Sequence, residues 1–263
     1  TYYGGTGNDN FVHILALTDG TLYGCGVTKS PNNIASPGSF QQVIGGLSDD
    51  FLVKFNTAGV RQWGTYFGDV DYDNCGSIAV DDSGYLFLAA GSKSVNNIST
   101  PGTYQPANNG GWDMVLAKFN SAGTEIWSTF YGGSGDEDSR AIQASGDTIY
   151  ISGTTNSLSG MVTPGCQQPV FGGGNFDCLL VKFIDCNVPD SASQINGTDS
   201  VCVPLSGNVY WIPPVTNALG YLWEMPTGAS IVSGQNTTAV IVDFDEGFVT
   251  GNISVKALNS CWY

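Results

Sequence analysis

A segment of about 64 residues occurs three times in succession, and this repeat limits the possible folds more than any other feature of the sequence. Lys54-Phe55-Asn56 returns as Lys118-Phe119-Asn120 and then as Lys182-Phe183, while Trp63 returns as Trp127. A repeat of this length is one structural unit that buries its apolar faces against neighbouring copies. The copies span about 1–64, 65–128 and 129–185.

Each copy has the pattern of four short strands. In the second copy they are expected at 77–80, 85–88, 114–119 and 125–130, where β-branched and aromatic residues gather between Gly-rich turns. Glycine is abundant, with 36 residues, and charged residues make up only 12% of the chain, which disfavours helical bundles. Four strands per repeat predict propeller-type blades, and propellers have about 4–8 of them. We therefore expect an all-β chain whose three four-stranded blades belong to a larger propeller, completed by further blades or another chain. The alternative is that the blades form an open stack.

The period ends after Phe183, and a different β unit is expected beyond it. A short linker is predicted at 186–190 and a small immunoglobulin-like β-sandwich at 191–263. Trp223 is the expected core tryptophan of this sandwich, with four apolar residues of two later strands facing it: Val240, Val242, Ile253 and Val255.

Two segments resemble known families. The strings "TYYGG", "IAVDDSGYLFLAAGS", "WDMVLAKFNSAG" and "IWSTFYGG" resemble the SBBP repeat of seven-bladed β-propellers in bacterial secreted proteins, over residues 1 to about 185. The string "YLWEMPTGASIVSGQNTTAVIVDF" is similar to the PKD-like modules of surface proteins exported by the type 9 secretion system. The resemblance implies a protein on the outer surface of a Gram-negative bacterium, with secretion-system components as partners during export.

Seven scattered cysteines on an acidic chain rich in small polar residues also favour an oxidising, extracellular compartment. Because seven is odd, at least one thiol has no partner within the chain. Three pairs are expected, with Cys186 left over: Cys202 with Cys261 across the sandwich, Cys25 with Cys75 between adjacent blades, and Cys166 with Cys178 inside the third blade.

The charge balance excludes several partners. The formal net charge is -15, so nucleic acid and anionic membranes are not expected to bind. No apolar run approaches the ~18 residues of a membrane span, so no membrane insertion is expected. Acidic side chains do attract divalent cations.

The turn before the second copy's first strand carries Asp69, Asp71 and Asp73, which could supply oxygen ligands to Ca²⁺. The turn lacks the Gly and Glu of an EF-hand loop. The alternative, which we favour, is that the aspartates hold the turn by bonds from side chain to backbone. No other cofactor is expected.

Other polar positions also admit both a structural and a binding role. Asp50, Asp113 and Asp177 precede the same apolar strand in each copy, and this repetition favours a structural role. Trp112 does not repeat and follows Asn108 and Asn109, a combination that is able to stack on a sugar ring or to cap a neighbouring blade.

Catalysis finds little support in the sequence. The lone His13 lies in a predicted strand and has no metal-ligand partner at useful spacing, and no phosphate-binding loop occurs. We expect no enzyme but a binding or adhesion scaffold, which recognises glycan or protein through the long loops 28–48, 92–112 and 155–175. The alternatives are a structural spacer or assembly subunit and, more distantly, a propeller-type glycan hydrolase.

Overall fold

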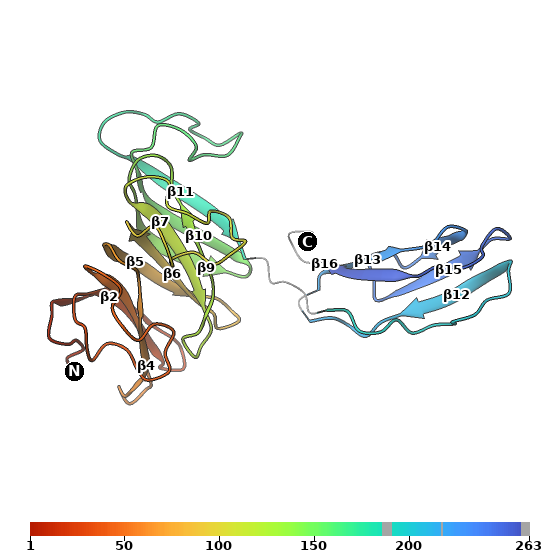
Figure 1. The fold of residues 1–263 in the computed structure, drawn as a ribbon, viewed down its shortest axis with the longest axis horizontal. Helices are drawn as coiled ribbons and strands as arrows, with labels where there is room; N and C mark the ends of the chain where they lie inside the picture. Colours follow the sequence, from red (N-terminus) through yellow and green to blue (C-terminus); the bar gives the residue numbers. More distant parts are fainter. Residues whose placement is uncertain (186–190, 217, 259–263) are drawn as a thin grey trace. The chain divides into compact units, whose positions relative to one another are not determined.

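Strands are the regular elements of this chain (Figure 1). The structure is a computed structural model, which describes residues 1–185, 191–216 and 218–258, and no helix occurs among them. The chain divides into two compact units, Thr1–Phe183 and Ile184–Tyr263. The predicted linker, 186–190, lies outside the described residues. Within the described part no helix is long and apolar enough to cross a membrane.

Three antiparallel sheets form the first unit, and in each one the strands follow one another in chain order. The first sheet contains β1 (Asp9–Ala16), β2 (Leu22–Thr28), β3 (Asp49–Phe55) and β4 (Arg61–Phe67). The second contains β5 (Asp73–Val80), β6 (Leu86–Ser92), β7 (Asp113–Phe119) and β8 (Glu125–Tyr131). The third contains β9 (Glu137–Ser145), β10 (Thr148–Thr155) and β11 (Asp177–Ile184).

The three sheets share two apolar cores, because each strand alternates its side chains between two faces. The core between the first and second sheets is formed by residues of both sheets, among them Tyr23, Leu52, Ile78, Leu88 and Val115. The core between the second and third sheets contains Phe87, Leu116, Ile142, Ile151 and Val181. Every residue of β6 and β7 is buried, so the middle sheet is covered on both faces.

Aromatic side chains repeat at these sheet contacts. Phe67 meets Phe119 edge to face with ring centroids 5.9 Å apart, and Tyr131 meets Phe183 in the same way at 5.6 Å. The turn before β8 shows the close fit. Gly123 has a φ of +81°, and a Cβ there would lie 2.8 Å from the Trp63 ring of the first sheet. A larger residue in this turn would therefore push the two sheets apart.

The predicted blades require one correction. The third sheet has three strands rather than four among the described residues, because the sequence after Phe183 lacks the Trp-containing fourth strand of the earlier copies. The fourth strands of the first two copies lie where they were predicted, as β4 and β8. Among the described residues the stack of sheets is open, with no closed ring.

The cysteine predictions have mixed outcomes. Cys25 on β2 and Cys75 on β5 form a disulfide with Cα atoms 6.6 Å apart, which joins the first two sheets. The predicted Cys166–Cys178 bond is wrong, because both are free thiols. That pairing rested on the two cysteines sharing a repeat, whereas Cys178 lies exposed on β11 and Cys166 lies in a long loop. Cys202 is exposed, and Cys186 and Cys261 lie outside the described residues.

Two antiparallel sheets with a common core form the second unit. One sheet contains β12 (Leu205–Trp211), β15 (Ala239–Phe244) and β14 (Ala229–Ser233), and the other contains β13 (Gly220–Glu224) and β16 (Ser254–Leu258). Trp223 is 2% exposed at the centre, and its indole Nε1 donates to the Thr237 carbonyl at 2.8 Å. The predicted neighbours of this tryptophan are confirmed as members of the same core: Val240, Val242, Ile253 and Val255.

Candidate functional site

Three long loops join the second and third strands of the three sheets, at 29–48, 93–112 and 156–176. Because the strands run antiparallel in the same order, all three loops leave their sheets at the same end of the strands. The loop between β10 and β11 projects beyond its sheet (Figure 1). Each loop has one buried apolar anchor, namely Ile34 (0% exposed), Ile98 (2%) and Met161 (5%). These buried anchors fix the loops on the sheets.

The loops also expose large apolar side chains to solvent. Val43, Tyr104 and Leu158, one from each loop, are 70%, 73% and 73% exposed. Further exposed apolar residues of the three loops are Phe40, Leu47, Val95, Val162, Val170 and Phe176. The repeat predicted where these loops lie but not their apolar residues, because an isolated Val or Leu in a polar stretch carries no periodic signal.

A carboxylate at the start of each third strand holds its loop. Asp113 accepts hydrogen bonds from Gln105 Nε2 (2.7 Å) and from the Asn109 backbone N–H (2.9 Å). Asp49 accepts from Gln41 Nε2 and the Gly45 backbone N–H, both at 2.8 Å. These bonds organise the loop, and both of those at Asp113 go to Oδ2.

The prediction for Asp50 is wrong by one residue. Asp49, not Asp50, occupies the position of Asp113 and of Asp177, which accepts from the Gly172 backbone N–H. Asp50 points to the other face of β3 and is fully buried against the second sheet. Neither of its carboxylate oxygens has a hydrogen bond of normal geometry among the described residues, although the Cys75 backbone amide lies near. Burial raises the pKa of Asp50 well above its usual range, and the nearby Asp73 and Asp49 raise it further.

The contacts of Asp69, Asp71 and Asp73 fit the favoured turn-holding role better than the alternative, a calcium site. Asp73 is 1% exposed and accepts from the Asp69 backbone N–H (2.9 Å), from Ser94 Oγ (3.2 Å) and from Ser92 Oγ. The Asp71 carboxylate accepts from the Tyr72 backbone N–H. Within the described residues no three His, Cys, Asp or Glu side chains converge to hold a metal ion. The aspartates hold the turn instead, and burial raises the pKa of Asp73 to about 7.

The residues of the predicted sugar-stacking site, Trp112, Asn108 and Asn109, make contacts within the protein. Asn108 Nδ2 donates to the Ser92 carbonyl at 3.0 Å, and the Asn109 backbone is held by Asp113. Trp112 is half-buried, with its ring close to the Gly91 backbone and the Lys93 ammonium 5.3 Å from the ring centroid. The Lys93 ammonium and the indole thus form a cation–π contact.

His13 bridges two sheets. The Ile78 backbone N–H donates to His13 Nδ1 at 3.2 Å, and Ser77 Oγ lies 3.3 Å from the same nitrogen. This contact joins β1 to β5, which gives the only histidine of the sequence a structural use.

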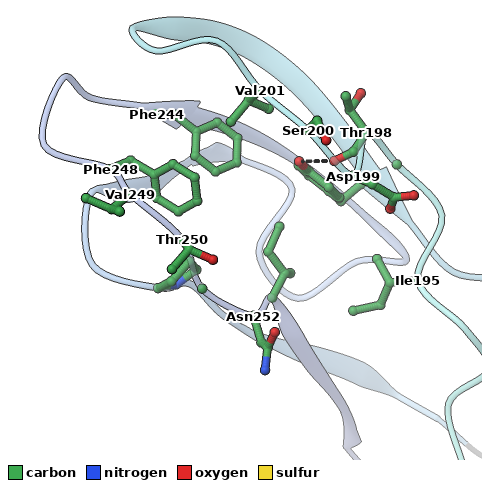
Figure 2. Close-up of a pocket in the computed structure, with 15 residues that line it drawn as sticks. Ile195, Thr198, Asp199, Ser200, Val201, Phe244, Phe248, Val249, Thr250 and Asn252 are labelled. Atoms are coloured by element: carbon green, nitrogen blue, oxygen red, sulfur yellow. Dashed lines mark hydrogen bonds between the residues drawn. The ribbon is translucent and has the colours of Figure 1, made fainter.

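Two of the surface cavities lie near loops. One of about 230 Å³ lies within the third long loop and is lined by Leu158, Met161, Val170 and Phe171 among others. The other, of about 560 Å³, lies in the second unit (Figure 2). There the rings of Phe244 and Phe248 pack edge to face, with centroids 4.8 Å apart, while Asp199 and Asn252 place polar atoms at the rim. The second cavity is lined by apolar and polar residues, with Asp199 as its one acidic lining residue, and no pattern in the sequence predicted it.

The comparisons with known proteins identify the class of the second unit. Residues 188–262 match the family model of the PKD-like domain. No curated protein matches the chain. The C-terminal unit is thus similar to PKD-like domains, and this domain type and the Cys25–Cys75 disulfide are consistent with an extracellular protein.

Proposed function

We propose that this chain is a secreted, cell-surface binding scaffold, which recognises glycan or protein through the three long loops of its first unit. One observation supports the proposal most strongly. The loops have buried anchors on a rigid stack of sheets, and yet each presents at least one large apolar side chain that is about 70% exposed or more: Val43, Tyr104 and Leu158. Rigid scaffolds with variable exposed loops are the usual way in which β proteins bind partners.

The three sheets act in this proposal as propeller-type blades. They hold the loops in parallel, so that a repetitive partner such as a polysaccharide contacts several loops at once. Weak contacts at neighbouring loops then add to a higher overall affinity. The PKD-like unit serves as a spacer, and export to the outer surface of a Gram-negative bacterium is part of the same proposal.

The test replaces one exposed residue in each loop. The triple variant Val43→Ser, Tyr104→Ser, Leu158→Ser is expected to lose binding to a polysaccharide array and to immobilised mucin, while its circular dichroism stays unchanged. Its melting temperature falls only slightly, because the Tyr104 ring also packs on Tyr131 and Phe183. Val60→Ser is the matched control, because Val60 is 57% exposed in the turn between β3 and β4, at the opposite end of the strands.

Two results would contradict the proposal. A triple variant that binds these surfaces as the unaltered chain does would exclude the loops. An unaltered chain that binds neither probe would favour the spacer, the alternative function.

A further inference from the structure

The first and third sheets each have one face that is not covered by another sheet of the first unit. We define the leading face of a sheet as the face toward the preceding sheet in the chain, and the trailing face as the face toward the next sheet. One internal core lies between the trailing face of the first sheet and the leading face of the second. The other lies between the trailing face of the second sheet and the leading face of the third.

The two faces without a covering sheet, which we call the open faces, are the leading face of the first sheet and the trailing face of the third. On the leading face of the first sheet, Tyr3 packs on the buried Phe51 and Phe55, whereas the part around Ile14 is exposed.

The leading face of the first sheet keeps the residues that are buried elsewhere. Ile14, Ile78 and Ile142 occupy the same position in the three copies. Ile78 is 1% exposed and Ile142 is 8% exposed, whereas Ile14 is 60% exposed. Around Ile14 lies a groove of about 400 Å³, whose lining includes Tyr3, Phe11, Leu22 and Phe55. This groove is the surface that an added sheet would cover.

The trailing face of the third sheet also carries apolar residues whose equivalents in the other two sheets are buried. Tyr150 is 41% exposed, although its counterparts Tyr23 and Phe87 are 2% and 1% exposed. Leu180 is 74% exposed, and its counterparts on β3 and β7 are fully buried, namely Leu52 and Leu116. An aromatic ring and a leucine are therefore retained at the two positions that insert into the next sheet.

We propose that the trailing face of the third sheet in one copy of the chain packs on the leading face of the first sheet in a second copy. Each copy of the chain has one such leading face and one such trailing face. Inside the chain, leading faces pack on trailing faces, and the contact between two copies would repeat this arrangement. The two faces are different surfaces, and the association is therefore head to tail, or heterologous.

A polar contact of the internal interface has its counterpart in this assembly. Inside the chain, Lys54 Nζ on the first sheet donates to the Ser121 carbonyl, at 3.1 Å, in the turn before β8 of the second sheet. The matching residues at the open faces are Lys182, which is exposed, and Thr57, which borders the groove. Lys182 of one copy is thus placed to donate to the Thr57 carbonyl of the next.

The interface between copies is weaker than the two interfaces inside the chain. Gln143 and Ser152 stand on the open trailing face where the second sheet has Ala79 and Ala89. These two polar side chains lose water when the face is covered, which lowers the free energy gained by association. The assembly is therefore reversible and depends on protein concentration.

The experiment is sedimentation velocity of the full chain over a wide range of concentrations. The unaltered chain is expected to form larger species as concentration rises. Ile14→Glu and Leu180→Glu, each at a position already exposed to solvent, are each expected to raise the dissociation constant by about 30-fold or more. Val249→Glu, in the second unit and 88% exposed in the unaltered chain, is the control that leaves association unchanged.

A mixing experiment tests the head-to-tail geometry. The Ile14→Glu chain retains an intact trailing face, and the Leu180→Glu chain retains an intact leading face, so an equimolar mixture is expected to form a 1:1 complex that neither variant forms alone. A chain that is monomeric at all concentrations would overturn the proposal, as expected if only a further repeat of a longer chain covers these faces. A mixture that forms no complex would overturn it too.

Discussion

Carboxylates at the starts of strands organise the loop end of the first unit. Asp9, Asp73 and Glu137 stand at or near the start of the first strands, one in each copy, and each accepts a backbone N–H from the preceding turn. A second set, at the start of the third strands, holds the long loops. An acidic residue that satisfies a turn in every copy is a structural part of the repeat, which explains why so acidic a chain has no metal cluster among its described residues.

Asp50 is the exception among these carboxylates, because it occupies an apolar position. Its counterpart in the second copy is Met114, which is 1% exposed in the next core. Asp50→Met is therefore expected to stabilise the chain by about 1–3 kcal/mol at neutral pH, the cost of a buried polar group without a hydrogen bond. Urea denaturation measures this change.

Asp49→Met is the matched control for that substitution. It removes the acceptor of the Gln41 and Gly45 bonds, and it is expected to lower the free energy of unfolding instead. If Asp50→Met destabilises the chain as much as Asp49→Met does, the buried carboxylate has a stabilising partner after all.

The stability of the first unit is expected to depend on pH. Burial raises the pKa of Asp73 to about 7 and that of Asp113 to about 6, from an ordinary value of 3.8. The folded chain therefore binds these protons more tightly than the unfolded chain does. The stabilisation is complete below the ordinary value and is lost as pH rises through about 6 to 7.

The free energy of unfolding is thus expected to fall between about pH 4 and about pH 7. Urea denaturation at a series of pH values measures it, and the variant with Asp73→Asn and Asp113→Asn is expected to show a flatter profile. A stability that rises over this range would show that other carboxylates dominate.

At the scale of the elements, isoleucines at one position of the repeat lie in two different environments. Ile78→Ala removes a side chain that is 1% exposed between two sheets and is expected to cost about 2–5 kcal/mol. Ile14→Ala, at the equivalent position of β1, removes a side chain that is 60% exposed and is expected to cost less than about 1 kcal/mol. The difference between the two variants in thermal or urea unfolding measures how much the neighbouring sheet contributes.

The repeat predicted most strands and the order of the sheets, because it supplies three aligned versions of one pattern. The repeat did not predict features that depend on the exact position of one residue or on one contact between two residues. Choosing Asp50 over Asp49 moved the side chain to the opposite face of β3, since neighbours on a strand point to opposite sides. The free Cys166 and Cys178 show that sharing a repeat does not bring two thiols together. The long loops lack periodicity, so their exposed apolar residues and the cavity of the second unit could not be predicted.

At the scale of the whole molecule, two kinds of β unit follow each other in the chain. The first gains its stability from contacts between neighbouring sheets, and the second has a core of its own around Trp223. In a stack, cooperative stability is highest where both neighbours are present. The middle sheet, with β6 and β7 fully buried, should therefore be the most stable part of the first unit.

Amide hydrogen exchange of the full chain under native conditions measures this order most directly. We predict that the amides of β6 and β7 exchange most slowly, and that those of β1 and β11, which lie in the sheets with an open face, exchange faster. Equal protection in the three sheets, or a middle sheet that exchanges faster than the outer two, would contradict the claim that each repeat is completed by its neighbours.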